Sequence, residues 1–277
     1  MSKTTLLASL TITLCALCSA QAGELIDVGD HKLAIARSGK GFPTVVLESG
    51  AGSDINSWTV ILPRVGELTS AIAYARAGRG DSEPAKTPRT LATVVEELRT
   101  FLLRAGCKPP YVLVGRSLGS IYVRAFAITH PAEVAGLILV DGTHERQGIE
   151  FARVSGMASE KYAEMWSKSL KGEKSHATRL EMEGLQTVFM TGELGISGKL
   201  PNVPMVIITN TQPQGPPAVL RMWRNLQDEL FQSTSRGMHI VTDKSGHDIA
   251  AKEPDIVVNA VRWVVNAVRE EPQANSK

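Results

Sequence analysis

The stretch YVLVGRSLGS, residues 111–120, decides the fold that we predict for this chain. It begins as an entirely apolar run, which is typical of a strand buried on both faces of a sheet. It continues into the pattern G-x-S-x-G, centred on Ser117, and then into residues 120–130, which favour a helix. A nucleophilic serine at a strand-to-helix turn has a strained backbone with no room for side chains two positions away, and Gly115 and Gly119 stand there. We therefore predict that Ser117 is a nucleophile presented at the edge of a sheet.

Short apolar runs alternate with helical patterns on both sides of this stretch. The predicted strands are residues 33–36, 44–47, 71–75, 111–114, 136–140, 205–209 and 239–241. Residues 91–102 and 257–268 carry apolar side chains at helical spacing, so each is expected to pack one face on the sheet. This alternation predicts an α/β fold, with a mostly parallel sheet covered by helices on both faces.

Residues 142–202 interrupt this rhythm, because they are polar and helical in character. They contain scattered bulky apolar side chains, namely Phe151, Met157, Tyr162, Met165, Trp166, Met182, Phe189 and Met190. We interpret the segment as a helical cap inserted in a single domain, residues 23–270. The bulky side chains either line an apolar substrate pocket or simply hold the cap on the domain. Residues 271–277 are predicted to be a disordered tail.

Composition and charge bound the function only loosely. The chain has 277 residues, of which 43% are hydrophobic and 21% charged, and its formal net charge is +2. This length can bury one substantial core. A nucleic-acid binder normally gathers its lysines and arginines into a stripe or tail, and this sequence does not. We expect no nucleic-acid partner.

The first 22 residues have the features of a secretory signal peptide. A lysine near the start precedes an apolar run over residues 6–17, and small residues leading to Ala22 offer a cleavage site. The run is shorter than the roughly 20 residues that span a bilayer, so no stable membrane insertion is expected. The mature chain would keep Cys107 as its single cysteine and would form no internal disulfide. We predict a secreted or periplasmic protein.

A serine hydroxyl needs a base to take its proton, and His247 has the expected position. It follows the last predicted strand and precedes the last predicted helix. A third group must orient the imidazole, and our candidate is Asp141, at the carboxyl end of strand 136–140. Asp141 could instead only cap the chain leaving the strand, in which case Asp228 or Asp243 would be the acid.

The negative oxygen that forms during acyl transfer needs backbone N–H donors. The helix that follows Ser117 offers the N–H of Leu118. A second donor is expected from the glycine-rich loop of residues 48–53, with Ala51 as the candidate and Gly52 as the alternative. The other interpretation of this loop is a plain flexible connection.

These motifs together resemble the α/β-hydrolase superfamily, in particular its carboxylesterase and lipase-like group, over residues 24–268. The resemblance is carried by residues 115–119, 140–141 and 245–247, and by the run RAGRGDS at 76–82, which is similar to the family's turn after the fourth strand. It implies a serine hydrolase that cleaves a small, partly apolar carboxylic ester through an acyl-enzyme. No zinc motif, cysteine cluster or P-loop appears, so neither a metal nor another cofactor is implied.

The chain departs from this family in the acid and in the oxyanion loop. Ser49-Gly50 stands where many relatives have His-Gly. The more usual position of the acid, one strand later, holds no carboxylate in residues 209–212. An acid at Asp141 resembles the dehalogenase-like branch, but that branch has an aspartate nucleophile, so Ser117 argues against dehalogenation and epoxide hydrolysis. The alternatives are an acyltransferase with the same triad and a non-catalytic binding protein.

Overall fold

The computed structural model describes residues 23–212 and 215–270 of the chain. The predicted signal peptide, residues 1–22, and the predicted tail, residues 271–277, lie outside the described residues. In the part that is described, no helix is both long and apolar enough to cross a membrane.

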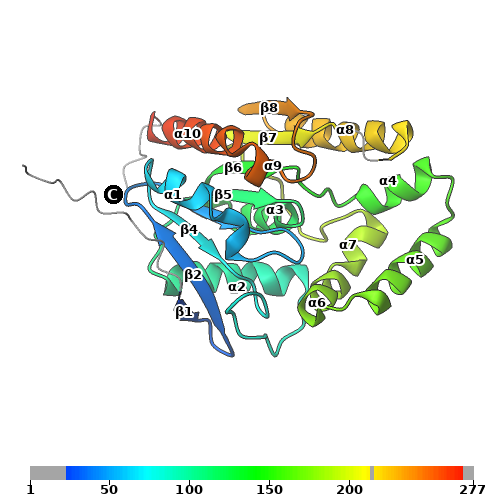
Figure 1. Ribbon diagram of the computed structural model, residues 1–277, viewed down its shortest axis with the longest axis horizontal. Coiled ribbons are helices and arrows are strands. Elements are labelled where there is room, and N and C mark those ends of the chain that lie inside the picture. Colours follow the sequence, from blue (N-terminus) through cyan, green and yellow to red (C-terminus); the bar gives the residue numbers. More distant parts are fainter. Residues whose placement is uncertain (1–22, 213–214, 271–277) are drawn as a thin grey trace, which may run out of the picture.

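Within the described ranges, eight strands form one sheet in the order β1-β2-β4-β3-β5-β6-β7-β8 (Figure 1). They are β1 (Glu24–Asp27), β2 (Lys32–Ser38), β3 (Thr44–Glu48), β4 (Ala71–Tyr74), β5 (Tyr111–Arg116), β6 (Val134–Val140), β7 (Met205–Asn210) and β8 (Gly237–Thr242). The pairs β1–β2 and β2–β4 are antiparallel, and the pairs from β4 onward are parallel. The predicted mostly parallel sheet is therefore confirmed.

Each predicted strand is present and most are longer than expected. Strand β1 was missed because it is a short edge strand in which Ile26 is the residue turned into the core. An edge strand that buries so little apolar surface gives a weak alternating pattern, so sequence alone does not distinguish it from a loop.

Helices cover both faces of the sheet, as predicted. They are α1 (Ile61–Gly66), α2 (Leu91–Arg104), α3 (Gly119–Thr129), α4 (Gln147–Val154), α5 (Ser159–Gly172), α6 (His176–Gly184), α7 (Gln186–Thr191), α8 (Pro217–Gln232), α9 (Ile249–Lys252) and α10 (Pro254–Glu270), with short 3-10 turns η1 (Ile55–Trp58) and η2 (Pro131–Glu133). Helices α2 and α3 pack on one face, while α1 and α10 pack on the other. Figure 1 shows the two layers of helices with the sheet between them.

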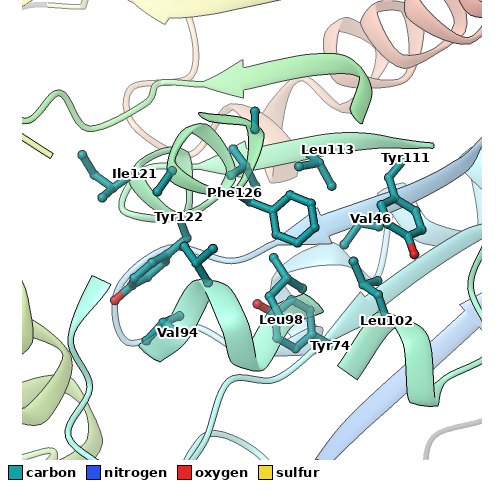
Figure 2. Close-up of a cluster of buried hydrophobic side chains, with 14 of the residues drawn as sticks. Val46, Tyr74, Val94, Leu98, Leu102, Tyr111, Leu113, Ile121, Tyr122 and Phe126 are labelled. Atoms are coloured by element: carbon teal, nitrogen blue, oxygen red, sulfur yellow. The ribbon is translucent and has the colours of Figure 1, made fainter. Parts of the chain in front are cut away.

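The core between α2, α3 and the sheet explains why α2 forms where it does. The Thr90 side chain accepts a hydrogen bond from the Thr93 N–H at 3.2 Å and caps the first turn. The apolar stripe of α2 is buried against Tyr74, Phe126 and their neighbours, as Figure 2 shows. Burying one large apolar side chain contributes about 1.5–3 kcal/mol, so this stripe is a main source of stability.

The parallel strands bring their carboxyl ends to one edge of the sheet. The register pairs Glu48 of β3 with Gly115 of β5, and Arg116 of β5 with Val140 of β6. Val140 in turn pairs with Ile208 of β7. The residues that follow these strands therefore emerge side by side at the edge where ligands bind in open α/β sheets.

Helices α4, α5, α6 and α7 lie between β6 and β7 in the sequence, inside the segment 142–202 that we interpreted as a cap. They gather at one end of the molecule, away from β1 and β2 (Figure 1). Helix α4 packs against α8, which joins β7 to β8. The cap helices and α8 thus face the carboxyl edge of the sheet together.

Candidate active site

Ser117 lies in the tight turn between β5 and α3. Its φ of 50° is in the left-handed region, which is strained for a residue with a side chain. The turn is held because the Ser117 N–H donates to the Val140 carbonyl at 3.0 Å and the Ser117 carbonyl accepts from the Ser120 N–H at 3.0 Å. A Cβ at Gly119 would lie 2.5 Å from the Glu48 carbonyl oxygen, which explains why this position is a glycine.

Asp141 follows β6 in the same strained conformation, with a φ of 45°. Its side chain is buried, and its Oδ2 lies 2.6 Å from Nδ1 of His247. Its Oδ1 accepts hydrogen bonds from the Asn210 N–H at 3.0 Å and from Trp223 Nε1–H at 3.2 Å. The carboxylate is therefore fixed in orientation on both of its oxygens.

The contact with Asp141 determines which ring nitrogen of His247 carries the proton. A carboxylate at Nδ1 holds the proton of the neutral imidazole there, which leaves Nε2 as an acceptor. The His247 side chain is 44% exposed and lines the same cavity as Ser117. In the described part of the chain, no direct hydrogen bond joins the Ser117 hydroxyl to His247. Such bonds are often long in empty sites and shorten when substrate binds.

An ion pair connects the neighbours of these two residues. Arg116, directly before Ser117, donates from Nη2 to Oδ1 of Asp248 at 3.1 Å. Asp248 directly follows His247, so the pair links the turn that carries Ser117 to the loop that carries His247. Sequence reasoning missed this link, because Arg116 occupies a variable position of the G-x-S-x-G pattern.

The loop of residues 48–53, which we call the oxyanion loop because it carries the predicted second donor, lies against Ser117. A Cβ placed on Gly50 would be 3.2 Å from the Ser117 Cβ. Ala51 and Leu118 are among the described residues that line the cavity, whereas Gly52 is not. Neither the Ala51 nor the Leu118 N–H donates a hydrogen bond to another described residue, so both are available for a ligand. The geometry favours Ala51 over Gly52 as the second donor.

The cavity in front of these groups has a volume of about 610 Å³. Its apolar lining comes largely from the cap and from α8: Phe151, Tyr162, Met165, Trp166, Met182, Phe189, Val219, Leu220, Met222 and Trp223. Met157 and Met190, which the sequence also singled out, are not among these lining residues. The α8 contribution was missed, although the apolar spacing over 219–230 indicates an amphipathic helix.

The two alternative acids lie elsewhere. Asp228, on α8, has its Oδ1 3.3 Å from Nδ1 of His239 and not from His247. Asp243 follows β8, and neither side chain is among those that line the cavity. Asp141 is thus the candidate acid that the structure brings to His247.

No grouping of three or more His, Cys, Asp or Glu side chains suited to a metal ion occurs in residues 23–212 and 215–270. The ionisable side chains of the cavity lining are Asp141, His247 and Tyr162. Asp141 is already directed at His247. The remaining surface offers apolar contacts and neutral polar groups, which suit an uncharged organic ligand.

Comparison with known proteins places this arrangement among related folds. Residues 43–179 match a family model described as alpha/beta hydrolase fold. YqjL, an uncharacterized protein of Bacillus subtilis strain 168, is 25% identical over 228 residues, which cover 81% of this chain and 84% of YqjL.

Solved structures superpose on most of the chain. A serine hydrolase from Cycloclasticus zankles has a TM-score of 0.65 at 16% identity, over 91% of this chain and 99% of its own. A thermophilic esterase from Thermogutta terrifontis has a TM-score of 0.59 at 19% identity, over 90% and 99%. At such identities the likeness is one of fold.

Proposed function

Because the chain belongs to the α/β-hydrolase superfamily, we propose that it is a serine hydrolase that cleaves a carboxylic ester. The observation that carries this proposal is the contact of Asp141 with His247 inside the cavity where Ser117 occupies a strained turn. A hydroxyl, an imidazole and a carboxylate in this order are the parts of a nucleophilic triad.

The proposed reaction proceeds through an acyl-enzyme. The Ser117 oxygen attacks the ester carbonyl carbon while Nε2 of His247 takes the hydroxyl proton. The N–H groups of Leu118 and Ala51 stabilise the negative oxygen of the tetrahedral intermediate. Collapse breaks the ester C–O bond, and His247 gives its proton to the departing alcohol. Water then attacks the acyl group by the same route and releases the acid.

The lining supports a small, uncharged and partly apolar ester as substrate. Aromatic and methionine side chains of the cap and α8 surround the space in front of Ser117. A charged group in that space would lose its hydration without gaining an ionic partner. The esterase from Thermogutta terrifontis, similar in fold, is consistent with ester chemistry on this scaffold.

Hydrolysis of p-nitrophenyl esters of graded acyl length tests the proposal. The wild-type protein should release p-nitrophenol, and Ser117→Ala should lower kcat by at least about 10⁴-fold. Equal activity in the variant would overturn the proposal. A fluorophosphonate probe should label Ser117, and failure to label would favour a non-catalytic binding protein. Products formed with a competing alcohol would separate hydrolysis from acyl transfer.

We also propose that the protein is exported and cleaved near Ala22. The support is the apolar run over residues 6–17 followed by small residues. Sequencing the N-terminus of protein recovered from the periplasm or medium should give Gly23 as the first residue. An intact Met1 in protein that stays in the cytoplasm would contradict it.

A further inference from the structure

Buried charged side chains lie beneath the oxyanion loop. Glu48 ends β3, Arg76 follows β4, and Glu181 belongs to the cap helix α6. Their side chains are at most 1% exposed. Charges so far from water are destabilising unless partners compensate them closely, so the contacts of Arg76 define its role.

The Arg76 guanidinium holds consecutive carbonyls of the oxyanion loop. Its Nη1 donates to the Ser49 carbonyl at 2.6 Å and also to the Glu48 carboxylate. Its Nη2 donates to the Gly50 carbonyl at 2.9 Å. The rigid fork of an arginine suits this task, because its N–H groups point in fixed directions within one plane.

The bond to Gly50 has a direct effect on the proposed oxyanion donor. The Gly50 carbonyl and the Ala51 N–H belong to one planar trans peptide group and point in opposite directions. Fixing the carbonyl oxygen on Arg76 therefore fixes the direction in which the Ala51 N–H points. A hydrogen bond to the carbonyl also polarises the peptide group, which strengthens its N–H as a donor.

Glu181 of the cap holds the guanidinium in place from the other side. Nε and Nη2 of Arg76 donate to Oε1 and Oε2 of Glu181 at 2.6 and 3.2 Å. Arg79 donates to the same carboxylate at 3.3 Å. Burial acts to raise the pKa of Glu181, but Arg76 and Arg79 outweigh it and keep this pKa below its usual value.

An aromatic ring also contacts the Arg76 guanidinium. Its central carbon, Cζ, lies 5.1 Å from the centre of the Tyr122 ring, which is part of the buried cluster in Figure 2. A cation over an aromatic face is attracted to it. Tyr122 belongs to α3, the helix that begins directly after the nucleophile turn. Arg76 thus contacts the oxyanion loop, the cap and the helix of the nucleophile.

We propose that Arg76 is a positioning residue of the oxyanion hole and that Glu181 holds it in place, so that the hole is complete only while the cap is docked. This inference rests on the proposed function. It predicts that a change in the cap, in a side chain that does not touch the substrate cavity, alters the chemical step.

A second buried ion pair provides a matched control. Arg89 donates from Nη2 to Oε1 of Glu97 at 2.7 Å, and both residues are buried. Glu97 lies on α2, and its ion-pair partners are Arg89 and His31, neither of which belongs to the oxyanion loop. Glu97→Gln therefore removes a comparable buried charge without altering the contacts of Arg76.

The test compares the steady-state kinetics of Glu181→Gln and Glu97→Gln at a temperature where both remain folded. We expect Glu181→Gln to lower kcat by about 10- to 100-fold, less than the loss of a whole oxyanion donor, with KM within about threefold. Glu97→Gln should keep kcat within about twofold although its Tm falls. Arg76→Lys, which retains the charge but not the fork, should behave as Glu181→Gln does. Equal kcat values for the two glutamine variants would overturn the inference.

Amide NMR gives a readout that does not depend on ester hydrolysis. The ¹⁵N chemical shift of Ala51 should change in Glu181→Gln relative to the wild type and stay unchanged in Glu97→Gln, because the hydrogen bond from Arg76 to the Gly50 carbonyl polarises the peptide group that contains the Ala51 nitrogen. The same Ala51 shift in both variants would overturn the inference, whether or not the protein is an esterase. An inactive wild-type protein whose Ala51 amide responds only to Glu181→Gln would refute the proposed function alone.

Discussion

Replacement of Asp141 by Asn tests the triad, because the side-chain amide of asparagine can take either of two orientations at this position. In the wild type, Oδ1 accepts from the Asn210 N–H and from Trp223 Nε1–H, while Oδ2 faces Nδ1 of His247. An asparagine offers one carbonyl oxygen and one NH₂ group for these opposite demands. The oxygen satisfies the N–H donors if it takes the Oδ1 position, which turns the NH₂ group toward His247.

That orientation gives the wrong tautomer of His247. The NH₂ group donates to Nδ1, so the ring proton moves to Nε2, which can no longer take the proton of Ser117. The opposite orientation restores the tautomer but leaves the N–H groups of Asn210 and Trp223 facing a donor. Each buried donor left without a partner costs about 1–3 kcal/mol, so this orientation is disfavoured by about 2–6 kcal/mol.

These energies set the expected loss of activity. At 1.36 kcal/mol per tenfold change in rate, the competent orientation is rarer by about 30- to 3 × 10⁴-fold. The missing negative charge beside the imidazolium slows the reaction further, so we expect kcat/KM to fall by at least about 10³-fold. The assay is p-nitrophenyl ester hydrolysis, with circular dichroism to show that the variant is folded.

Asp228→Asn and Asp243→Asn are the matched controls, because these carboxylates are not among the groups that line the cavity. Both should keep kcat/KM within about twofold of the wild type. A rate within tenfold of the wild type for Asp141→Asn would refute the tautomer argument. Inactivation by Asp228→Asn or Asp243→Asn instead would assign the acid to that position.

Other predictions concern the support of the site and the stability of the fold. Trp223→Phe removes one donor to the acid, worth about 1.5 kcal/mol, and should lower kcat by about tenfold in the same assay. Gly119→Ala places a Cβ 2.5 Å from a backbone oxygen and should lower Tm sharply, whereas Gly172→Ala meets open space in a helix and should raise stability by about 0.5–1 kcal/mol in urea unfolding. Burial lowers the pKa of His144 from 6.5 to about 4. Its contribution to the free energy of unfolding is therefore present above pH 6.5 and declines as the pH falls toward 4. His144→Phe should weaken that decline in urea unfolding measured across this pH range. Hydrogen bonds to the carboxylates of Glu97 and Asp30 raise the pKa of His31 above 6.5. Its contribution to the free energy of unfolding is therefore present below pH 6.5 and declines as the pH rises through the raised pKa. His31→Gln should remove that decline in urea unfolding measured across this pH range.

The strand-to-helix turn at Ser117 and the sheet could be predicted because their signals are local. The apolar run of β5 and the glycines around Ser117 act on atoms within a few residues, so the order of residue types fixes the turn. The parallel strands are buried on both faces and give continuous apolar runs. The edge strand β1 lacks this property and was missed.

The hydrogen-bond partners of Asp141 could not be predicted, because they come from elements that meet only in the folded protein. Asn210 reaches Asp141 across 69 positions of the chain, and Trp223 reaches it across 82. In the sequence, Trp223 is one of several apolar residues at helical spacing, and such a pattern indicates a buried face without naming its neighbour. The contact between Asn210 and Asp141 forms because β6 and β7 are neighbours in the sheet.

The buried ion pair of Arg76 and Glu181 is a second contact that could not be predicted from the sequence. Glu181 lies in a segment rich in charged residues, where a glutamate is ordinarily solvated, and the sequence attributes Arg76 to a turn. Their ion pair joins residues 105 positions apart. Burying either charge alone would be strongly destabilising, so each is tolerated only because the cap docks against the turn that follows β4. A sequence motif points to candidate reactive groups, whereas the groups that hold them in position depend on how distant segments pack.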